Sequence, residues 1–158
     1  MTKPLAGLLA AVVAIAMIAA GCGSSDDSTD STGSLTKAEF VKQGNAICAK
    51  GEKEIGEGFE EFAKENNLPK NKQPSQAQLT EAVEEVVLPT VSDEVESIRD
   101  LGLPKEGGKE ADEVLKAAEE AIEKGEEDPA ALASEKNDPF ADANKKARDF
   151  GLTKCGEE

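Results

Sequence analysis

Apolar residues recur at steps of three and four positions over most of the chain beyond residue 35, and no segment alternates apolar and polar residues. Steps of three and four place side chains on one face of an α-helix, whereas a half-buried strand requires alternation. The β-branched residues fall on the helical spacing as well. The sequence therefore predicts an all-α fold, a small bundle of about four helices over residues 35–158.

The first predicted helix begins after Thr36, where Thr36-Lys37-Ala38-Glu39 has the pattern of a capping box. Glycine weakens a helix by about 1 kcal/mol relative to alanine. Gly44 and Gly51 nevertheless lie on the apolar face, which indicates that another helix approaches closely there. The polar, proline-containing stretch 66–74 predicts a loop. The predicted apolar face consists of Phe40, Gly44, Ile47, Cys48, Gly51, Ile55, Phe59 and Phe62.

A second capping box, Ser75 to Gln78, predicts the start of the next helix. Pro89 interrupts its apolar spacing, because proline lacks the N–H and crowds the preceding turn. We therefore expect either one kinked helix or two abutting helices. Gly102-Leu103-Pro104 predicts the end of this segment.

The remaining predicted helices follow similar signals. One runs from about Lys109 to Lys124, with Gly125 as its stop. Asp128-Pro129 and Asp138-Pro139 each combine an N-cap residue with proline at the first helical position. The second pair predicts a short helix that continues to Phe150.

The N-terminus has the features of an export signal. It has a cationic start at Lys3, an uncharged run of 17 residues over 4–20, and small residues before Cys22. The quartet Ala19-Ala20-Gly21-Cys22 resembles a bacterial lipobox. That resemblance implies cleavage between Gly21 and Cys22 and a diacylglyceryl group on Cys22. An uncleaved transmembrane helix, which needs about 20 residues, and plain secretion are the alternatives.

The lipobox interpretation divides the chain into a signal peptide (1–21), a lipidated cysteine with its tether (22–34) and an acidic helical domain (35–158). The tether segment 23–34 has no apolar residue and three aspartates, so we expect it to be flexible. Two or three acyl chains, such as palmitate, anchor a protein firmly. We therefore expect attachment to the cell membrane, on its extracytoplasmic face, through the lipid on Cys22.

The chain has three cysteines, an odd number that requires explanation in an exported protein. If Cys22 carries the lipid, Cys48 and Cys155 remain, and an oxidising compartment would pair them in a disulfide. The alternative is two unpaired buried thiols. No C-x-x-C occurs, which argues against a redox-active dithiol.

These features together resemble a group of small, uncharacterised bacterial lipoproteins, especially of actinobacterial type. The resemblance is based on the lipobox, the Ser/Asp-rich tether, and the segments 35–48 and 151–156. It implies a surface location and a helical domain with a cysteine pair. It implies no activity and no catalytic residues.

The composition argues against several functions. The chain has no His, Trp or Tyr, so imidazole catalysis, imidazole metal sites and stacking of glycans on these aromatic residues are not expected. The net charge is −15, and loss of residues 1–21 removes one Lys and no acid, which leaves −16. Such a charge repels nucleic acid. We expect no enzymatic activity, cofactor or metal site.

The many carboxylates show no pattern typical of catalysis or specific metal binding. Adjacent glutamates on a helix point to different parts of its surface, and nothing marks a pair as buried. The segment 28–39 can be aligned with a twelve-residue calcium loop, but its first position is Ser28 instead of aspartate. The capping box already explains Glu39, and specific calcium binding is therefore not expected.

Two functions remain. The favoured one is a non-enzymatic interaction or structural module that docks an unknown protein of the cell envelope. The alternative is a small-ligand carrier, with a pocket between helices formed near Pro89, Gly44 and Gly51. A carrier requires an enclosed apolar cavity of about 300 Å³ or more between helices, whereas a docking module requires a filled core and an exposed apolar patch.

Overall fold

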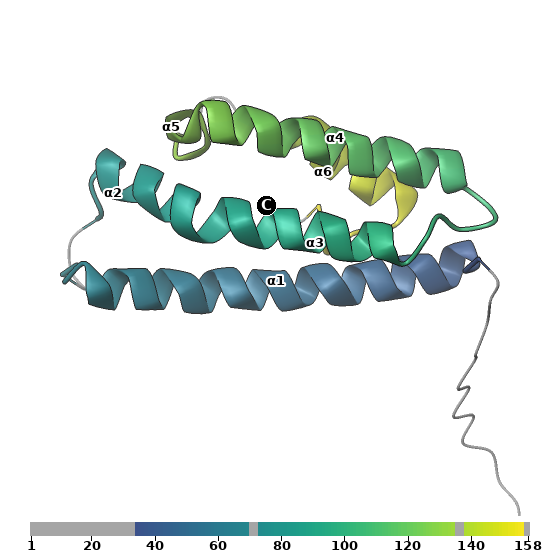
Figure 1. The fold of residues 1–158 in the computed structure, drawn as a ribbon, viewed down its shortest axis with the longest axis horizontal. Helices are drawn as coiled ribbons and strands as arrows, with labels where there is room; N and C mark the ends of the chain where they lie inside the picture. The colour runs from purple at the N-terminus through teal and green to yellow at the C-terminus, as the bar shows by residue number, and fades with distance from the viewer. Residues whose placement is uncertain (1–33, 70–72, 135–137, 157–158) are drawn as a thin grey trace, which may run out of the picture. The chain divides into compact units, whose positions relative to one another are not determined.

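The computed structural model describes residues 34–69, 73–134 and 138–156. In these ranges the chain is helical and contains no strand, which confirms the predicted all-α bundle (Figure 1). The predicted signal peptide, Cys22 and the tether up to residue 33 lie outside the described residues. The elements are α1 (Lys37–Glu65), α2 (Gln76–Ala82), the π-helical turn η1 (Val83–Val87), α3 (Leu88–Asp100), α4 (Gly108–Glu127), α5 (Pro129–Leu132) and α6 (Ala141–Phe150).

Both predicted capping boxes are present. At the start of α1, the Thr36 N–H donates to the Glu39 carboxylate at 2.9 Å, and the Glu39 N–H donates to Thr36 Oγ1 at 3.3 Å. At the start of α2, Ser75 and Gln78 exchange the same two hydrogen bonds, at 2.9 and 3.4 Å. These bonds satisfy N–H groups that have no partner within the helix.

The segments α2, η1 and α3 run on as one helix, and the backbone accommodates Pro89 through the π turn. Pro89 cannot donate a backbone hydrogen bond, and here Leu88 N–H bonds five residues back, to the Val83 carbonyl. The Thr90 hydroxyl donates to the Val86 carbonyl at 2.7 Å. The interruption predicted at Pro89 is thus a widened turn inside a continuous helix.

The predicted stop at Gly125 is wrong, because α4 continues to Glu127. Gly125 is buried, and a Cβ there would lie 2.5 Å from Leu132 Cδ1 and 2.8 Å from Leu88 Cδ2. The glycine therefore allows close packing within the bundle. The chain turns at Asp128, whose carboxylate accepts the Ala131 N–H at 3.1 Å and caps α5.

The predicted start of the last helix at Asp138-Pro139 is also wrong by a few residues. Asp138 Oδ1 accepts the Phe140 N–H at 2.8 Å and so stabilises a turn, and α6 begins only at Ala141. The helix ends as expected, at Gly151, which has a φ of 114°. A left-handed backbone of this kind favours glycine.

The core forms where α1 packs on α3, α3 on α4, and α4 on α6 (Figure 1). The rings of Phe40 and Phe150 meet edge to face, with centroids 6.0 Å apart, and join the start of α1 to the end of α6. Phe59 is an exception to the predicted apolar face of α1. Its side chain is 37% exposed. Further buried members of the core are Cys48, Val95, Ile98, Leu115 and Leu152.

Candidate functional site

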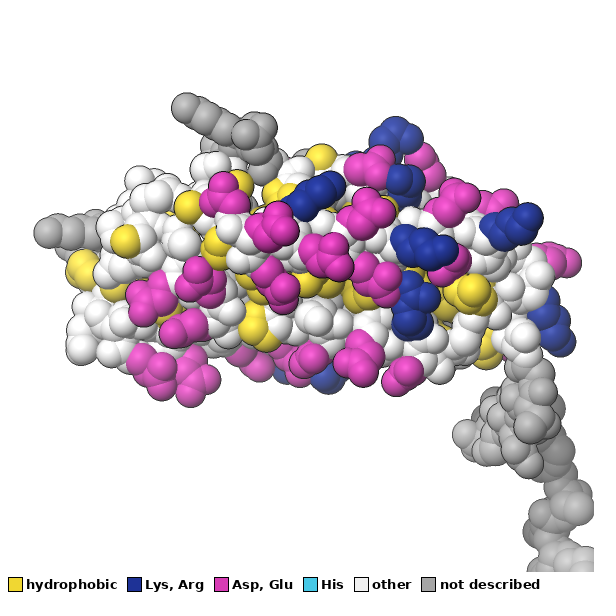
Figure 2. Space-filling model, turned by 45° about the horizontal axis from the view of Figure 1, so that its top comes forward, with side chains coloured by type: hydrophobic (Ala, Val, Ile, Leu, Met, Phe, Trp, Pro, Cys, Tyr) yellow, Lys and Arg dark blue, Asp and Glu magenta, His cyan; other side chains and the backbone are white. Residues whose placement is uncertain are grey.

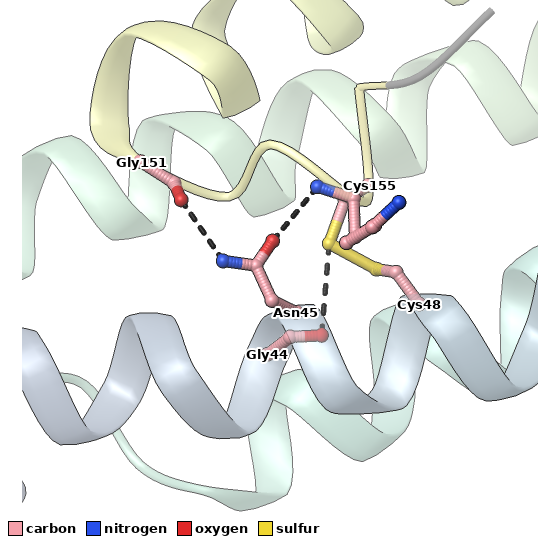
Figure 3. The surroundings of a disulfide bond; sticks show 6 residues. Gly44, Asn45, Cys48, Gly151 and Cys155 are labelled. Carbon is pink, nitrogen blue, oxygen red and sulfur yellow. Dashed lines mark hydrogen bonds between the residues drawn. A yellow bond between two sulfur atoms is a disulfide. The ribbon is translucent and has the colours of Figure 1, made fainter.

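The structure brings together Cys48 and Cys155, the two cysteines that the sequence analysis expects to pair. Cys48 in α1 and Cys155 in the C-terminal tail are joined as a disulfide, with Cα atoms 5.1 Å apart (Figure 3). The bond spans 107 positions of sequence, so it closes a loop through almost the entire helical domain. It holds the tail that follows α6 against the middle of α1.

Asn45 provides a second attachment for the tail, one that the sequence analysis did not predict. Its Nδ2 donates to the Gly151 carbonyl at 3.0 Å, and its Oδ1 accepts the Lys154 N–H at 2.8 Å (Figure 3). Gly44 lies directly beside it, and a Cβ there would come within 2.5 Å of the buried Leu152. The only sequence signal for this contact is an amide side chain next to the apolar face of a helix.

A cleft of about 360 Å³ lies between α1, η1 and α3 on one side and α5, the start of α6 and the tail on the other. It is open to solvent, and a hollow of about 50 Å³ that shares several of its residues lies next to it. Apolar and disulfide side chains make up much of the wall. The lining residues are Cys48, Ile55, Val87, Val91, Leu132, Phe140 and Cys155, with Glu52, Glu94, Asp138, Asn144 and Lys154 as the polar members.

Glu94 is the lining residue with the most unusual environment. Its side chain lies against the backbone of α1 at Gly51, where an added Cβ would come within 1.6 Å of Glu94 Oε1. Among the described residues, none forms a hydrogen bond or an ion pair with its carboxyl group. Burial, and secondarily the charge of Glu54, raise the pKa of Glu94 to about 7.

Several other charged groups form ordinary surface pairs. Arg99 in α3 bonds Glu119 in α4, with 2.6 Å between nitrogen and oxygen, and also lies 3.4 Å from Asp112. Lys50 and Glu54 pair at 2.7 Å within α1. On the face drawn in Figure 2, acidic side chains are more abundant than basic ones, and hydrophobic atoms show in the seams between them. This charge distribution is typical of a solvated surface.

Within residues 34–69, 73–134 and 138–156, no group of three or more potential ligands is arranged to hold a metal ion. In the same ranges, no helix has the length and apolarity that crossing a membrane requires. No protein-family model, curated protein or solved structure matches the chain. Inferences about function therefore depend on the cleft and on the chemistry of its lining.

Proposed function

We propose that the protein is an extracytoplasmic, lipid-anchored binding protein whose helical domain holds a small, largely apolar ligand in the cleft between α1, α3 and α6. The observation that carries this proposal is the apolar wall of the 360 Å³ cleft, since two other surface hollows of about 370 Å³ have mostly polar linings. Ligand sites typically have volumes of roughly 300–1,000 Å³ and a few polar groups in an apolar wall. The cleft differs from the pocket predicted for a carrier, because it is open to solvent and Pro89, Gly44 and Gly51 do not line it. Its apolar wall nevertheless favours the carrier over the docking module.

The anchored location is part of the proposal and depends on Cys22. A disulfide between Cys48 and Cys155 is typical of a protein in an oxidising compartment. Cys22 is then the one cysteine of the chain that is outside this disulfide. Lipid attached there would hold the helical domain at the outer surface of the membrane. The membrane, reached through this lipid, is the partner that we propose.

The docking module stays a prediction and has less support. Among the described residues, the only large hydrophobic side chains that are exposed are Phe59 and Leu103. Leu103 lies close to the start of α1, since the nearby Lys105 N–H donates to the Leu35 carbonyl at 2.9 Å. Phe59 lies 24 residues along α1 from Leu35, roughly 36 Å away at 1.5 Å per residue. The two side chains therefore do not form one patch.

The proposal is tested by titrating the full chain with 1-adamantanol, a compact neutral probe, while the methyl signals of the protein are followed by NMR. We expect saturable shifts at Ile55, Val87 and Val91, and little change at Ile122 in the core. Val91→Trp should fill the cleft and abolish these shifts. Leu103→Trp, at an exposed site, is the matched control and should leave them intact. Unsaturable shifts, or equal shifts in Val91→Trp, would contradict a ligand cleft.

A further inference from the structure

We infer that the cleft selects ligands in which a protonated amine is attached to an apolar body, with the Glu94 carboxylate as the acceptor for the amine. This inference rests on the proposed ligand-binding function and specifies the class of ligand. The apolar lining, the position of Glu94 and the charges around the cleft support it.

The position of Glu94 is determined by the contact between two helices. The carboxyl group lies in the space that the missing side chain of Gly51 leaves on α1. Glu94 lines the 360 Å³ cleft and the adjacent 50 Å³ hollow, so a molecule in the cleft can reach it. It also borders a polar hollow of about 370 Å³ that Lys50 and Glu54 line. Apolar neighbours at Val91 and Phe140 line the same two spaces.

No described residue donates a hydrogen bond to the carboxyl oxygens of Glu94. A carboxylate has two acceptor oxygens with about four lone-pair sites. Partial removal of a carboxylate from water costs free energy unless a hydrogen-bond donor or a cation takes the place of the lost water. No described side chain or backbone N–H does so, and a ligand amine with three N–H donors fits this requirement.

The charges around the cleft also favour a cation. Glu52 on α1 and Asp138 before α6 join Glu94 in the lining, and Lys154 in the tail is the only basic residue among the described lining groups. Groups just outside the lining are mixed: Glu54 and Lys50 on α1 pair with each other. Asp93 on α3 adds a further acid on the side towards Lys50. An anionic ligand would therefore meet an excess of like charge.

The ionisation of Glu94 adds a measurable consequence. With its pKa raised to about 7, roughly a tenth of the molecules carry the carboxylate at pH 6 and about nine tenths at pH 8. If only the ionised form holds the amine, the apparent affinity should rise about tenfold between these pH values. An amine with a pKa near that of lysine stays protonated throughout this range.

The experiment uses the full lipidated chain in zwitterionic nanodiscs, with empty nanodiscs as the blank, and isothermal titration calorimetry at pH 6 and pH 8. Three probes share one apolar body: 1-adamantylamine, 1-adamantanol and 1-adamantanecarboxylate. At pH 8 we expect the amine to bind at least tenfold more tightly than the alcohol, and the carboxylate most weakly. Glu94→Gln should remove this preference, whereas Glu96→Gln, at an exposed position of α3, should retain it.

The outcomes separate the inference from the proposed function. Binding of the alcohol without preference for the amine, or a preference that persists in Glu94→Gln, would overturn the inference and leave the ligand cleft standing. Failure of all three probes to bind would overturn both. If Glu94→Gln does not fold, the wild-type pH series decides, and equal affinity for the amine at pH 6 and pH 8 counts against the role of Glu94.

Discussion

Replacement of Glu94 by glutamine should change how the stability of the domain depends on pH. In the folded protein the pKa of Glu94 is raised from 4.5 to about 7, first by burial and then by Glu54. Between these two values the folded state binds more protons at this position than the unfolded state does. Stability therefore falls as the pH rises from about 4.5 to 7 and then levels off. Glutamine resembles the protonated acid and cannot ionise, so the variant should lack this loss.

The magnitude follows from the size of the shift. At 1.36 kcal/mol per pKa unit, a shift from 4.5 to about 7 corresponds to roughly 3 kcal/mol if the group is fully shielded from solvent. Because the Glu94 side chain remains partly exposed, solvent screening reduces the expected effect to about 1–2 kcal/mol. Near pH 4.5 the two proteins should be about equally stable, and at pH 8 the variant should be more stable by that amount.

The assay is urea unfolding followed by far-ultraviolet circular dichroism, since the chain has neither Trp nor Tyr to report by fluorescence. The difference in unfolding free energy between variant and wild type removes the contributions of the other acids. Glu96→Gln, on the same helix and exposed, removes an equal charge and should change stability by no more than about 0.5 kcal/mol at any pH. A difference for Glu94→Gln that is constant from pH 4.5 to 8, or that favours the wild type at high pH, would refute the reasoning.

Three further predictions concern the tail, the helix contact and the anchor. Reduction of Cys48–Cys155 should lower the unfolding free energy by about 2–4 kcal/mol, seen as a lower urea midpoint; an unchanged midpoint would contradict this. Gly51→Ala should stabilise the domain by about 1 kcal/mol in a Glu94→Ala background but not in the wild type, where the new Cβ meets Glu94; equal effects in a double-mutant cycle would show that the two positions are independent. Cys22→Ser should release the protein from membranes, and wild-type protein whose intact mass lacks an acyl adduct would argue against the anchor.

Local sequence signals predicted the helices well wherever the deciding interactions are also local. The capping boxes at Thr36 and Ser75 involve side chains three residues apart, so their pattern is visible in the sequence and present in the structure. Gly125 was misinterpreted for the opposite reason. Gly125 allows close packing against Leu88, which is distant in sequence, and against Leu132, which follows the turn after α4. From the sequence alone, the same glycine could equally have ended a helix.

The candidate site was only partly predictable. Cysteine counting identified the pair Cys48 and Cys155, because an unpaired cysteine is unusual in an exported chain. Glu94 could not be singled out among the 33 acidic residues, since its burial depends on the helix opposite. Gly51 did indicate a close approach to α1. The sequence could not show that the approaching group is a carboxylate.

The cleft and the stability of the fold depend on the same few contacts. Cys48 and Asn45 fasten the tail to α1, and this attachment places Cys155 and Lys154 in the cleft wall opposite Val91 and Glu94. Leu152 is anchored in the core between these points, so the tail also completes the packing of the bundle. The additional bonds at residues 151, 154 and 155 hold the tail beside the cleft, so the same contacts fix one wall of the cleft and the packing of the bundle.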